Sequence, residues 1–389
     1  MEEKLTGKES TYWLENCPGT NFPQLKEEID VDVAVLGGGV VGVTTAKLLK
    51  ESGFKVALIE AHRIVEDVTV GTTAKISVAP NIIYNNLISN LGPKKAQLYA
   101  DSNIKSLQKM ESIIKDGNID CDFQKLPLYI YSKSSANREK IEAEYQAAKS
   151  LGLPVSYTES IPSPFKTGAA IKYDEQAQFH PRKYLLALSK ELDGDGSYVF
   201  EKTMVTTVKQ GRKKEVITDH GSLLADKVVV ATHIPVYDTD SVKEHLHPER
   251  SYVLALYAND DFPEGMFVEI DPTHTYRTTP TENGKLIIVA GEHSPVDVED
   301  KTIYYNRLID YARDHLDVTS IEYRWSSKDV VTDDGLPMIG QTSEEGIYMA
   351  TGMSFWGMIN GTAAAMVNTD LIKGKKNEYM ELFDPLRFR

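Results

Sequence analysis

The stretch DVAVLGGGVVGVTTAKLLKESGFKVALIEA, from Asp32 to Ala61, decides the fold class of this chain. Residues 33–36 form a short apolar run rich in β-branched side chains, which predicts a buried parallel strand. Residues 40–50 carry apolar side chains at helical spacing, and residues 56–59 predict a second strand. Strand, helix and strand in this order predict a βαβ unit of an α/β protein.

Three glycines, Gly37, Gly39 and Gly42, occupy the three positions of the pattern GxGxxG between the first strand and the helix. Gly37 permits a tight turn, Gly39 lets a pyrophosphate approach the backbone, and Gly42 lets helix and strand pack closely. We expect the pyrophosphate to lie against the amide groups of Val40 and Val41 at the helix N-terminus. A turn without a ligand is the alternative for a glycine-rich loop.

The second strand ends at Glu60, about 18 residues after the last glycine of the pattern. A carboxylate at this place accepts both hydroxyls of an adenosine ribose and repels the 2′-phosphate of NADP. We expect Ala61 and His62, which follow directly, to contact the same cofactor. The stretch as a whole therefore predicts a dinucleotide site.

The segment VGTTAKISVAP, residues 70–80, suits a flavin better than a nicotinamide, because it is a poor candidate for the next strand of an NAD-type sheet. Thr72, Thr73 and Ala74 would offer hydroxyls and backbone amides to the cofactor. Lys75 would place a positive charge near an electron-rich ring. An ordinary turn is the alternative for the threonines.

A third segment, after a helix that begins at Pro181, predicts strands around residues 198–200, 203–209, 215–218 and 227–230. The last of these strands runs into Ala231 and Thr232. Small residues at the carboxyl end of a parallel strand lie where open α/β sheets bind ligands. His233 is expected to be a turn residue rather than a catalyst.

The C-terminal stretch repeats the strand–glycine–helix design: a strand at 347–350, then Gly352 and Gly357, then a helix from about Met358. The positive end of this helix would stabilise the negative N1–C2=O edge of a reduced flavin. Phe355 and Trp356 would supply flat surfaces near the ring. A packed helix with aromatic core residues is the alternative.

Composition excludes several other classes of function. The 389 residues favour two joined domains, and the formal net charge of −14 disfavours a nucleic-acid partner. No apolar run approaches the length of a membrane span, and the charged N-terminus lacks a signal-type apolar region, so we expect a cytoplasmic protein. Cys17 and Cys121 cannot form an iron–sulfur site, and His245 with His247 lack further ligands, so no metal is expected.

Together, the unit ending at Glu60, GTTAK, ATHIP, TDDGLPMIG and ATGMSFWGMINGTAA resemble the D-amino-acid oxidase and glycine oxidase superfamily of FAD-dependent oxidoreductases. STYW at residues 10–13 and the ending ELFDPLRFR are most similar to a subgroup that often carries a Rieske iron–sulfur domain after the flavin part. The chain stops at Arg389, where that domain would begin, and it lacks the cysteines to form one.

The resemblance implies an α/β (α+β overall) fold with a Rossmann-like FAD-binding domain and an inserted mixed-sheet substrate domain. It implies an N-terminal arm at 1–29, an FAD-binding domain at 30–85, 172–238 and 325–389, and a substrate-binding domain at 86–171 and 239–324. The cofactor contacts that it implies are Gly37, Gly39, Gly42, Glu60, Thr72, Thr73, Val205, Thr232, Gly352, Gly357 and Met358. FAD should be noncovalent, because the histidine or cysteine that some relatives attach to it is missing.

The resemblance also implies oxidation of a small amine or amino acid by hydride transfer to flavin N5, with O₂ or another electron acceptor. Relatives bind the substrate carboxylate through an arginine at the edge of the substrate sheet, and Arg277, beside Tyr276, lies in a similar sequence. A solvated arginine is the alternative. Ala79 and Pro80 replace the Gln-His of the subgroup, and Lys75 would stabilise the reduced flavin or assist oxygen. An NAD-dependent dehydrogenase and a noncatalytic flavin-binding or redox-sensing protein are the other readings.

Overall fold

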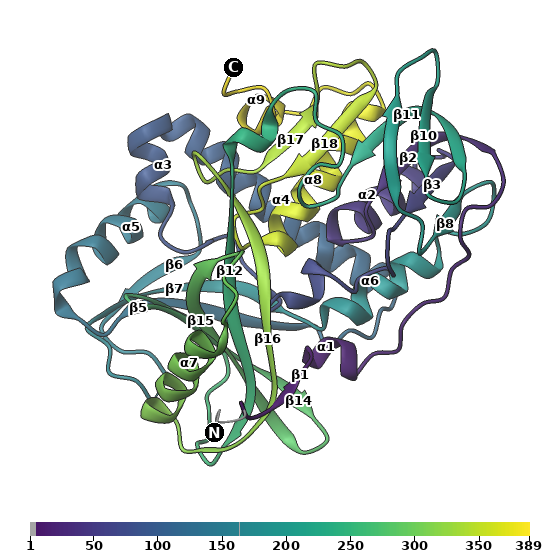
Figure 1. Cartoon of the computed structure of the whole chain (residues 1–389). Helices are drawn as coiled ribbons and strands as arrows, with labels where there is room; N and C mark the ends of the chain where they lie inside the picture. The colour runs from purple at the N-terminus through teal and green to yellow at the C-terminus, as the bar shows by residue number, and fades with distance from the viewer. Residues whose placement is uncertain (1–4, 163) are drawn as a thin grey trace.

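Two β-sheets with helices packed around them form the protein (Figure 1). The computed structural model describes residues 5–162 and 164–389. One sheet has eight strands and the other ten. Within the described ranges, no helix is long and apolar enough to cross a membrane.

The βαβ unit predicted from the sequence is present. It consists of β2 (Ile29–Leu36), α2 (Val40–Glu51) and β3 (Val56–Ile59). The two strands are parallel, and their apolar side chains from Val31 onward are completely or almost completely buried. The predicted α/β fold class is confirmed.

The eight-stranded sheet continues this unit on both sides in the order β17-β18-β11-β2-β3-β8, with the β9–β10 hairpin attached to β11. The pairs β18–β11, β11–β2, β2–β3 and β3–β8 are parallel. Their carboxyl ends therefore meet at one edge of the sheet, which is where this class of sheet binds ligands. The further strands are β8 (Tyr198–Phe200), β9 (Val205–Lys209), β10 (Lys214–Thr218), β11 (Ser222–Val230), β17 (Met338–Gln341) and β18 (Ile347–Thr351).

The helix α8 (Gly357–Ile372) packs across α2 near the N-termini of both helices. Gly361 makes this crossing possible, because a Cβ atom on it would lie 2.9 Å from Cγ1 of Val40 and 3.3 Å from Cγ2 of Val41. The two helix N-termini are thereby held close to the same edge of the sheet. The other helices are α1 (Tyr12–Glu15), α3 (Tyr84–Leu91), α4 (Pro93–Asp116), α5 (Arg138–Ser150), α6 (Pro181–Lys190), α7 (Thr302–His315) and α9 (Met380–Phe383).

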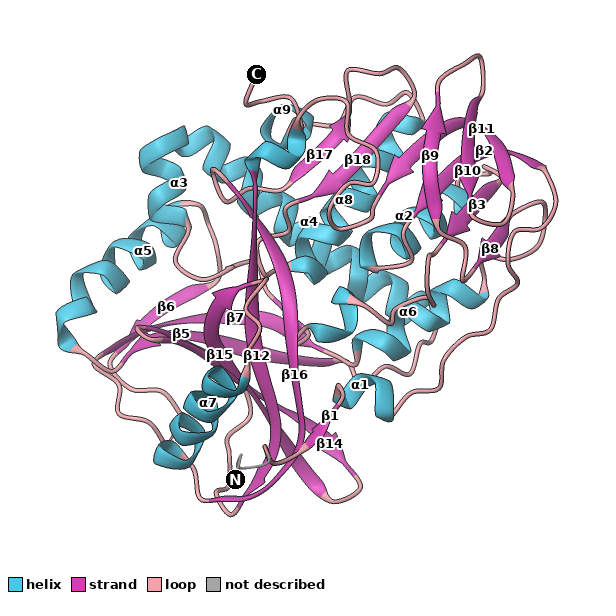
Figure 2. Ribbon diagram, in the orientation of Figure 1, coloured by secondary structure: helices cyan, strands magenta, loops and turns pink. Residues whose placement is uncertain are grey.

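The ten-stranded sheet is mixed and has the order β1-β16-β12-β15-β14-β13-β5-β7-β4, with β6 paired to β7. α7 packs on one face of this sheet (Figure 2). A cluster of aromatic and aliphatic side chains lies at this contact. Its strands are β1 (Lys8–Glu9), β4 (Lys75–Ile76), β5 (Gln124–Ser132), β6 (Val155–Thr158), β7 (Ala169–Gln178), β12 (Leu246–Ala258), β13 (Met266–Ile270), β14 (Thr273–Thr281), β15 (Gly284–Pro295) and β16 (Val318–Thr332).

Two strands cross the domain boundaries that the resemblance implies, and one helix packs against the other proposed domain. β7 and β16 extend past residues 172 and 325, yet both pair within the ten-stranded sheet. α4, from the segment expected in the substrate domain, packs against α8. One hydrophobic cluster also joins residues of both sheets. The proposed domain limits stay a prediction.

Candidate active site

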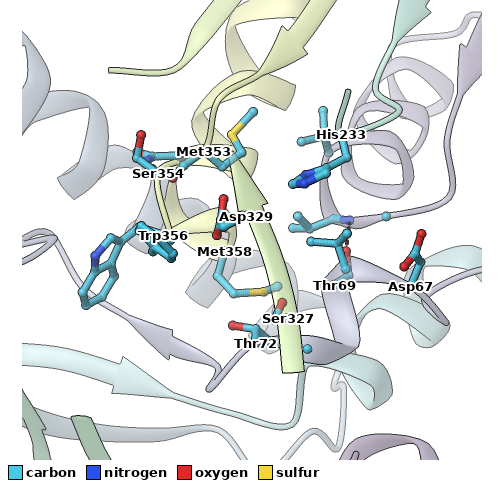
Figure 3. A pocket seen from close by; sticks show the side chains of 18 of the residues that line it. Asp67, Thr69, Thr72, His233, Ser327, Asp329, Met353, Ser354, Trp356 and Met358 are labelled. Carbon is cyan, nitrogen blue, oxygen red and sulfur yellow. Dashed lines mark hydrogen bonds between the residues drawn. The ribbon is translucent and has the colours of Figure 1, made fainter. Parts of the chain in front are cut away.

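A cavity of about 750 Å³ lies between the two sheets. One side is formed by residues that follow β2, β3, β11 and β18 at the carboxyl edge of the eight-stranded sheet. The other side is formed by β12, β14, β15 and β16. Figure 3 shows side chains from several of these segments around the cavity. Its volume is in the range of cofactor and ligand sites.

Two of the glycines in the βαβ unit are required by close backbone contacts. Gly37 has φ +108°, and a Cβ atom there would lie 2.5 Å from the carbonyl oxygen of Ala231. A Cβ atom on Gly42 would lie 1.8 Å from the carbonyl oxygen of Gly37. Gly37 lines the cavity and Gly42 does not, so Gly42 packs the helix against the turn without facing the cavity.

The carboxylate of Glu60 is held at the end of β3 by two backbone amides. It accepts hydrogen bonds from Gly38 N at 2.6 Å and from His62 N at 2.8 Å. A carboxylate has about four lone-pair sites, so acceptor capacity is left for ribose hydroxyls. The side chain is therefore oriented as an adenosine-binding acid requires.

Thr69 is a site residue that sequence reasoning missed. It lies in the 3₁₀ helix Val68–Gly71, and its Oγ1 accepts a hydrogen bond from Val40 N at 3.1 Å. This amide belongs to the N-terminus of α2, where the pyrophosphate is expected. No signal in the sequence marked Thr69, because the contact joins a 3₁₀ helix to the N-terminus of α2, about 30 residues apart.

The structure brings most of the predicted cofactor residues together. Ala74 is an exception besides Gly42: it is fully buried with φ +57°, and its amide donates to Oγ1 of Thr72. Ala74 therefore shapes the turn without lining the cavity. The predicted residues that line the cavity are Gly37, Gly39, Val40, Val41, Glu60, Ala61, His62, Thr72, Thr73, Val205, Ala231, Thr232, Gly352, Phe355, Trp356, Gly357 and Met358.

Lys75 also lines the cavity, in the short strand β4. Its ammonium nitrogen donates to Oγ1 of Thr73 and to Oγ1 of Thr275, both at 2.8 Å. Burial, together with the nearby charge of Arg277, lowers the pKa of Lys75 well below its usual range.

Arg277 does not occupy the predicted place at a sheet edge. β14 lies between β13 and β15, and the side chain is 1% exposed. Its guanidinium donates to the carbonyl oxygens of Thr73, Ala74, Phe179 and Thr278, and Trp13 stacks against it. Arg277 is not among the cavity-lining residues. Its hydrogen bonds instead fix the turn that carries Thr72 and Thr73.

Tyr276 faces the opposite side of the sheet from the cavity. Side chains alternate along a strand, so Thr275 points into the cavity and Tyr276 points away from it. Its ring packs against Phe165 and Phe262 in the cluster beneath α7. This placement corrects the expectation that Tyr276 lies beside the substrate.

The N-terminus of α8 lies at the cavity and carries Gly357 and Met358. Ser354 and Phe355, in the loop before it, have φ +49° and +66°. Because non-glycine residues rarely adopt positive φ, surrounding contacts must hold this loop. Phe355 keeps 38% of its surface exposed and contacts the ring of His293 at 5.4 Å.

Asp329 is the second residue that sequence reasoning missed. It lies on β16, lines the cavity, and accepts hydrogen bonds from Val330 N at 2.7 Å and from the amide of Phe355. Burial raises the pKa of Asp329 to about 6. The alternation of residues along β16 was the available signal, but its register was unknown.

His233, His245 and His247, the histidines weighed in the sequence, differ in where they lie. His233, after β11, has φ +63° and lines the cavity, and burial lowers its pKa. His245 and His247 lie outside the cavity lining and both contact Asp333. In the part of the chain that the structure describes, no group of three or more histidine, cysteine or acidic side chains is arranged to hold a metal ion.

The parallel sheet, its glycine turn, the acid at the end of β3 and the facing mixed sheet define a dinucleotide-dependent oxidoreductase. The donor set fits FAD, since amides at the α2 N-terminus face the pyrophosphate position and the α8 N-terminus faces the ring position. The chain belongs to the family of FAD dependent oxidoreductases, whose model matches residues 32–371. The cofactor predicted from the sequence, FAD, is that of this family.

Known proteins that resemble the chain agree with this family. It is 34% identical over 384 residues to the putative Rieske 2Fe-2S iron-sulfur protein YhfW of Bacillus subtilis, covering 97% of this chain and 75% of that protein. It is 24% identical to gamma-glutamylputrescine oxidoreductase of Escherichia coli, covering 92% and 87%. The structure of glycine oxidase from Geobacillus kaustophilus superposes with a TM-score of 0.79 at 17% identity, covering 92% and 99%.

Proposed function

We propose that the protein oxidises a small amine or amino acid with noncovalent FAD in the cavity between the two sheets. The observation that carries this proposal is the continuity of the cavity, which runs from Glu60 to the wall formed by β14 and β16. A dinucleotide bound at Glu60 and at the N-terminus of α2 would reach the N-terminus of α8. A substrate would then lie between the ring and the sheet.

When bound, FAD supplies a hydride acceptor for the carbon that bears the amine, and the resulting imine is hydrolysed by water. The chain itself supplies position, exclusion of water and electrostatics. The N-terminus of α8 stabilises negative charge at the ring edge, and Lys75 offers a buried amine beside Thr73 and Thr275. A substrate that arrives as the free amine needs no further base.

Noncovalent binding is supported by the chemistry of the lining. Cys17 and Cys121 lie outside the cavity lining. Lys75 occupies the place where some relatives attach the flavin through a histidine. Denaturation with acid should therefore release all of the flavin into the supernatant, and flavin that remains with the precipitate would contradict this part of the proposal.

The test of the reaction is anaerobic mixing of the holoprotein with a panel of amines and amino acids. We expect at least one compound to bleach the flavin absorbance near 450 nm, which marks two-electron reduction. Readmission of O₂ then separates an oxidase from a dehydrogenase by the rate of reoxidation. If no compound of the panel reduces the flavin, the proposal is wrong and a noncatalytic flavin-binding function is favoured.

A further inference from the structure

The sheet wall of the cavity is almost free of charge. Strands β12, β14, β15 and β16 present small or neutral residues there, such as Val253, Thr275, Ala290 and Ser327. His293 and Asp329 are the titratable side chains that these four strands contribute to the described lining. A substrate held against this wall therefore meets one carboxylate and one imidazole.

A substrate carboxylate would lack a free cationic partner at this wall. Among the described lining residues, the lysines and arginines are Arg63 and Lys75. Arg63 lies three residues after Glu60, at the dinucleotide end of the cavity. Lys75 already donates to two hydroxyls. The guanidinium of Arg277 is not part of the cavity lining and donates to the backbone carbonyls of Thr73 and Ala74.

Asp329 is a carboxylate in the cavity lining that has no cationic partner. Its hydrogen-bond partners are the amides of Val330 and Phe355, and no ion pair reaches it within the described residues. Two amides occupy about half of the acceptor sites of a carboxylate. The nearby charge is also negative, since Glu249 repels it. A bound ammonium group would supply the missing charge and donors.

Apolar and aromatic side chains line the same cavity as this acid. Met353, Trp356 and Met358 are among them, and the view of Figure 3 draws the carboxylate of Asp329 between their side chains. Aromatic faces attract cations, and a partly desolvated site strengthens this attraction. An alkylammonium ion combines a charge for the carboxylate with CH₂ groups for such a lining.

We propose that the substrate is an amine with no carboxylate on its reacting carbon, and that it enters as a cation whose ammonium group binds Asp329. The bound ammonium ion releases one proton to water before the hydride leaves, so the free amine is the species that is oxidised. This inference rests on the proposed function and names the substrate class of the same site. An amino acid is disfavoured because its carboxylate would be brought near Asp329 with no guanidinium to neutralise it.

Asp329 also has a structural role that must be separated from binding. Its hydrogen bond to the amide of Phe355 helps to hold the loop whose φ angles are positive at Ser354 and Phe355. Asp329→Asn retains an oxygen that can accept from an amide but removes the charge. Asp329→Glu retains the charge. The two variants therefore separate loop geometry from charge recognition.

The experiment compares matched pairs on the holoprotein: pyrrolidine with proline, ethylamine with alanine, phenethylamine with phenylalanine, and cadaverine with lysine. Binding is measured by perturbation of the flavin spectrum and of tryptophan fluorescence, and reduction by anaerobic bleaching. We expect the amine to bind at least about tenfold more tightly than its amino acid in every pair that binds, since an unpaired buried charge costs about 1.5 kcal/mol or more.

Asp329→Asn should weaken amine binding about tenfold or more at an unchanged ratio of flavin to protein, and Asp329→Glu should restore part of it. The matched control is Glu322→Gln, which removes an acid of the same strand, β16, outside the cavity lining and should leave amine binding within about twofold. If Asp329→Asn loses FAD, the comparison of each amine with its amino acid in the wild-type holoprotein still tests the proposed substrate class.

Preference for the amino acid in the pairs that bind, unchanged amine affinity in flavin-loaded Asp329→Asn, or no binding of any amine would each overturn the inference. Amine binding that depends on Asp329 but never bleaches the flavin would contradict the proposed function and leave the assignment of the site intact. The two failures therefore give different results.

Discussion

The two ends of the cavity are built in different ways. At the dinucleotide end, function depends on backbone groups of consecutive residues, from Gly37 to Val40, and on one acid held by backbone amides. At the sheet wall, function depends on side chains from four strands spread over residues 246–332. The first end is a local motif, and the second exists only after strand pairing has been fixed.

Removal of Arg277 is the largest expected effect and tests whether this arginine belongs to the scaffold or to the substrate site. Arg277→Ala leaves buried carbonyls of Thr73, Ala74 and Phe179 without their donor, so we expect a loss of about 3–5 kcal/mol in unfolding free energy. Chemical denaturation measures this loss. A stable variant with a selectively higher KM for amino acids would restore Arg277 to the role predicted from the sequence.

A methyl group on Gly42 should produce the next largest effect. Gly42→Ala places a Cβ atom 1.8 Å from the carbonyl oxygen of Gly37, so the turn must move by more than side chains can absorb. We expect about 2–3 kcal/mol of destabilisation and a large loss of bound flavin. The matched control is Gly53→Ala, where a Cβ atom meets nothing within 4 Å and only the positive φ opposes it. Equal flavin loss in both variants would contradict the steric explanation.

Glu60→Gln should lower FAD affinity by about tenfold and leave the fold stable. Its carboxylate accepts from the amides of Gly38 and His62, and an amide side chain turns an NH₂ group toward one of these donors. Loss of one charged hydrogen bond costs about 1.5 kcal/mol or more. Flavin fluorescence during dilution measures the dissociation constant, and the melting temperature of the apoprotein should fall only slightly, because one of the two amides keeps its acceptor.

The smallest and most specific effect is the pH dependence of amine binding. Burial raises the pKa of Asp329 to about 6, with a contribution from Glu249, while the amides of Val330 and Phe355 oppose the shift. The carboxylate is charged above this pH and neutral below it, so amine affinity should fall as pH drops through about 6. Spectral titrations between pH 5 and 8 measure the change. The inflection should disappear in Asp329→Asn, and its persistence there would assign it to another group.

These differences explain how much of the molecule the sequence could predict. Strands, helix and acid of the βαβ unit follow from local composition, and the structure contains them at almost the predicted residues. The helix predicted from about Met358 begins at Gly357. Each of these features depends on residues close together in the chain, so local reasoning was sufficient.

The sheet wall could not be predicted in the same way. Whether Thr275, Tyr276 or Arg277 faces the cavity depends on how β14 pairs with β13 and β15, and a shift of one residue exchanges the two faces. Asp329 contacts the amide of Phe355, 26 residues later in the chain, through a tertiary contact. Oγ1 of Thr69 accepts a hydrogen bond from the amide of Val40, 29 residues earlier in the chain. No pattern in the neighbouring sequence predicted that Asp329 or Thr69 would lie at the cavity.

The close crossing of α2 and α8 fixes the distance between the two helix N-termini that we expect to contact the cofactor. Gly361 sets the separation between the helix end that faces the diphosphate and the helix end that faces the ring. A ligand that is held by both positive ends must carry a negatively charged group and a ring at that separation. A larger side chain at Gly361 would increase the separation between α2 and α8. The diphosphate would then remain in place at α2, while the ring lost its alignment with the N-terminus of α8.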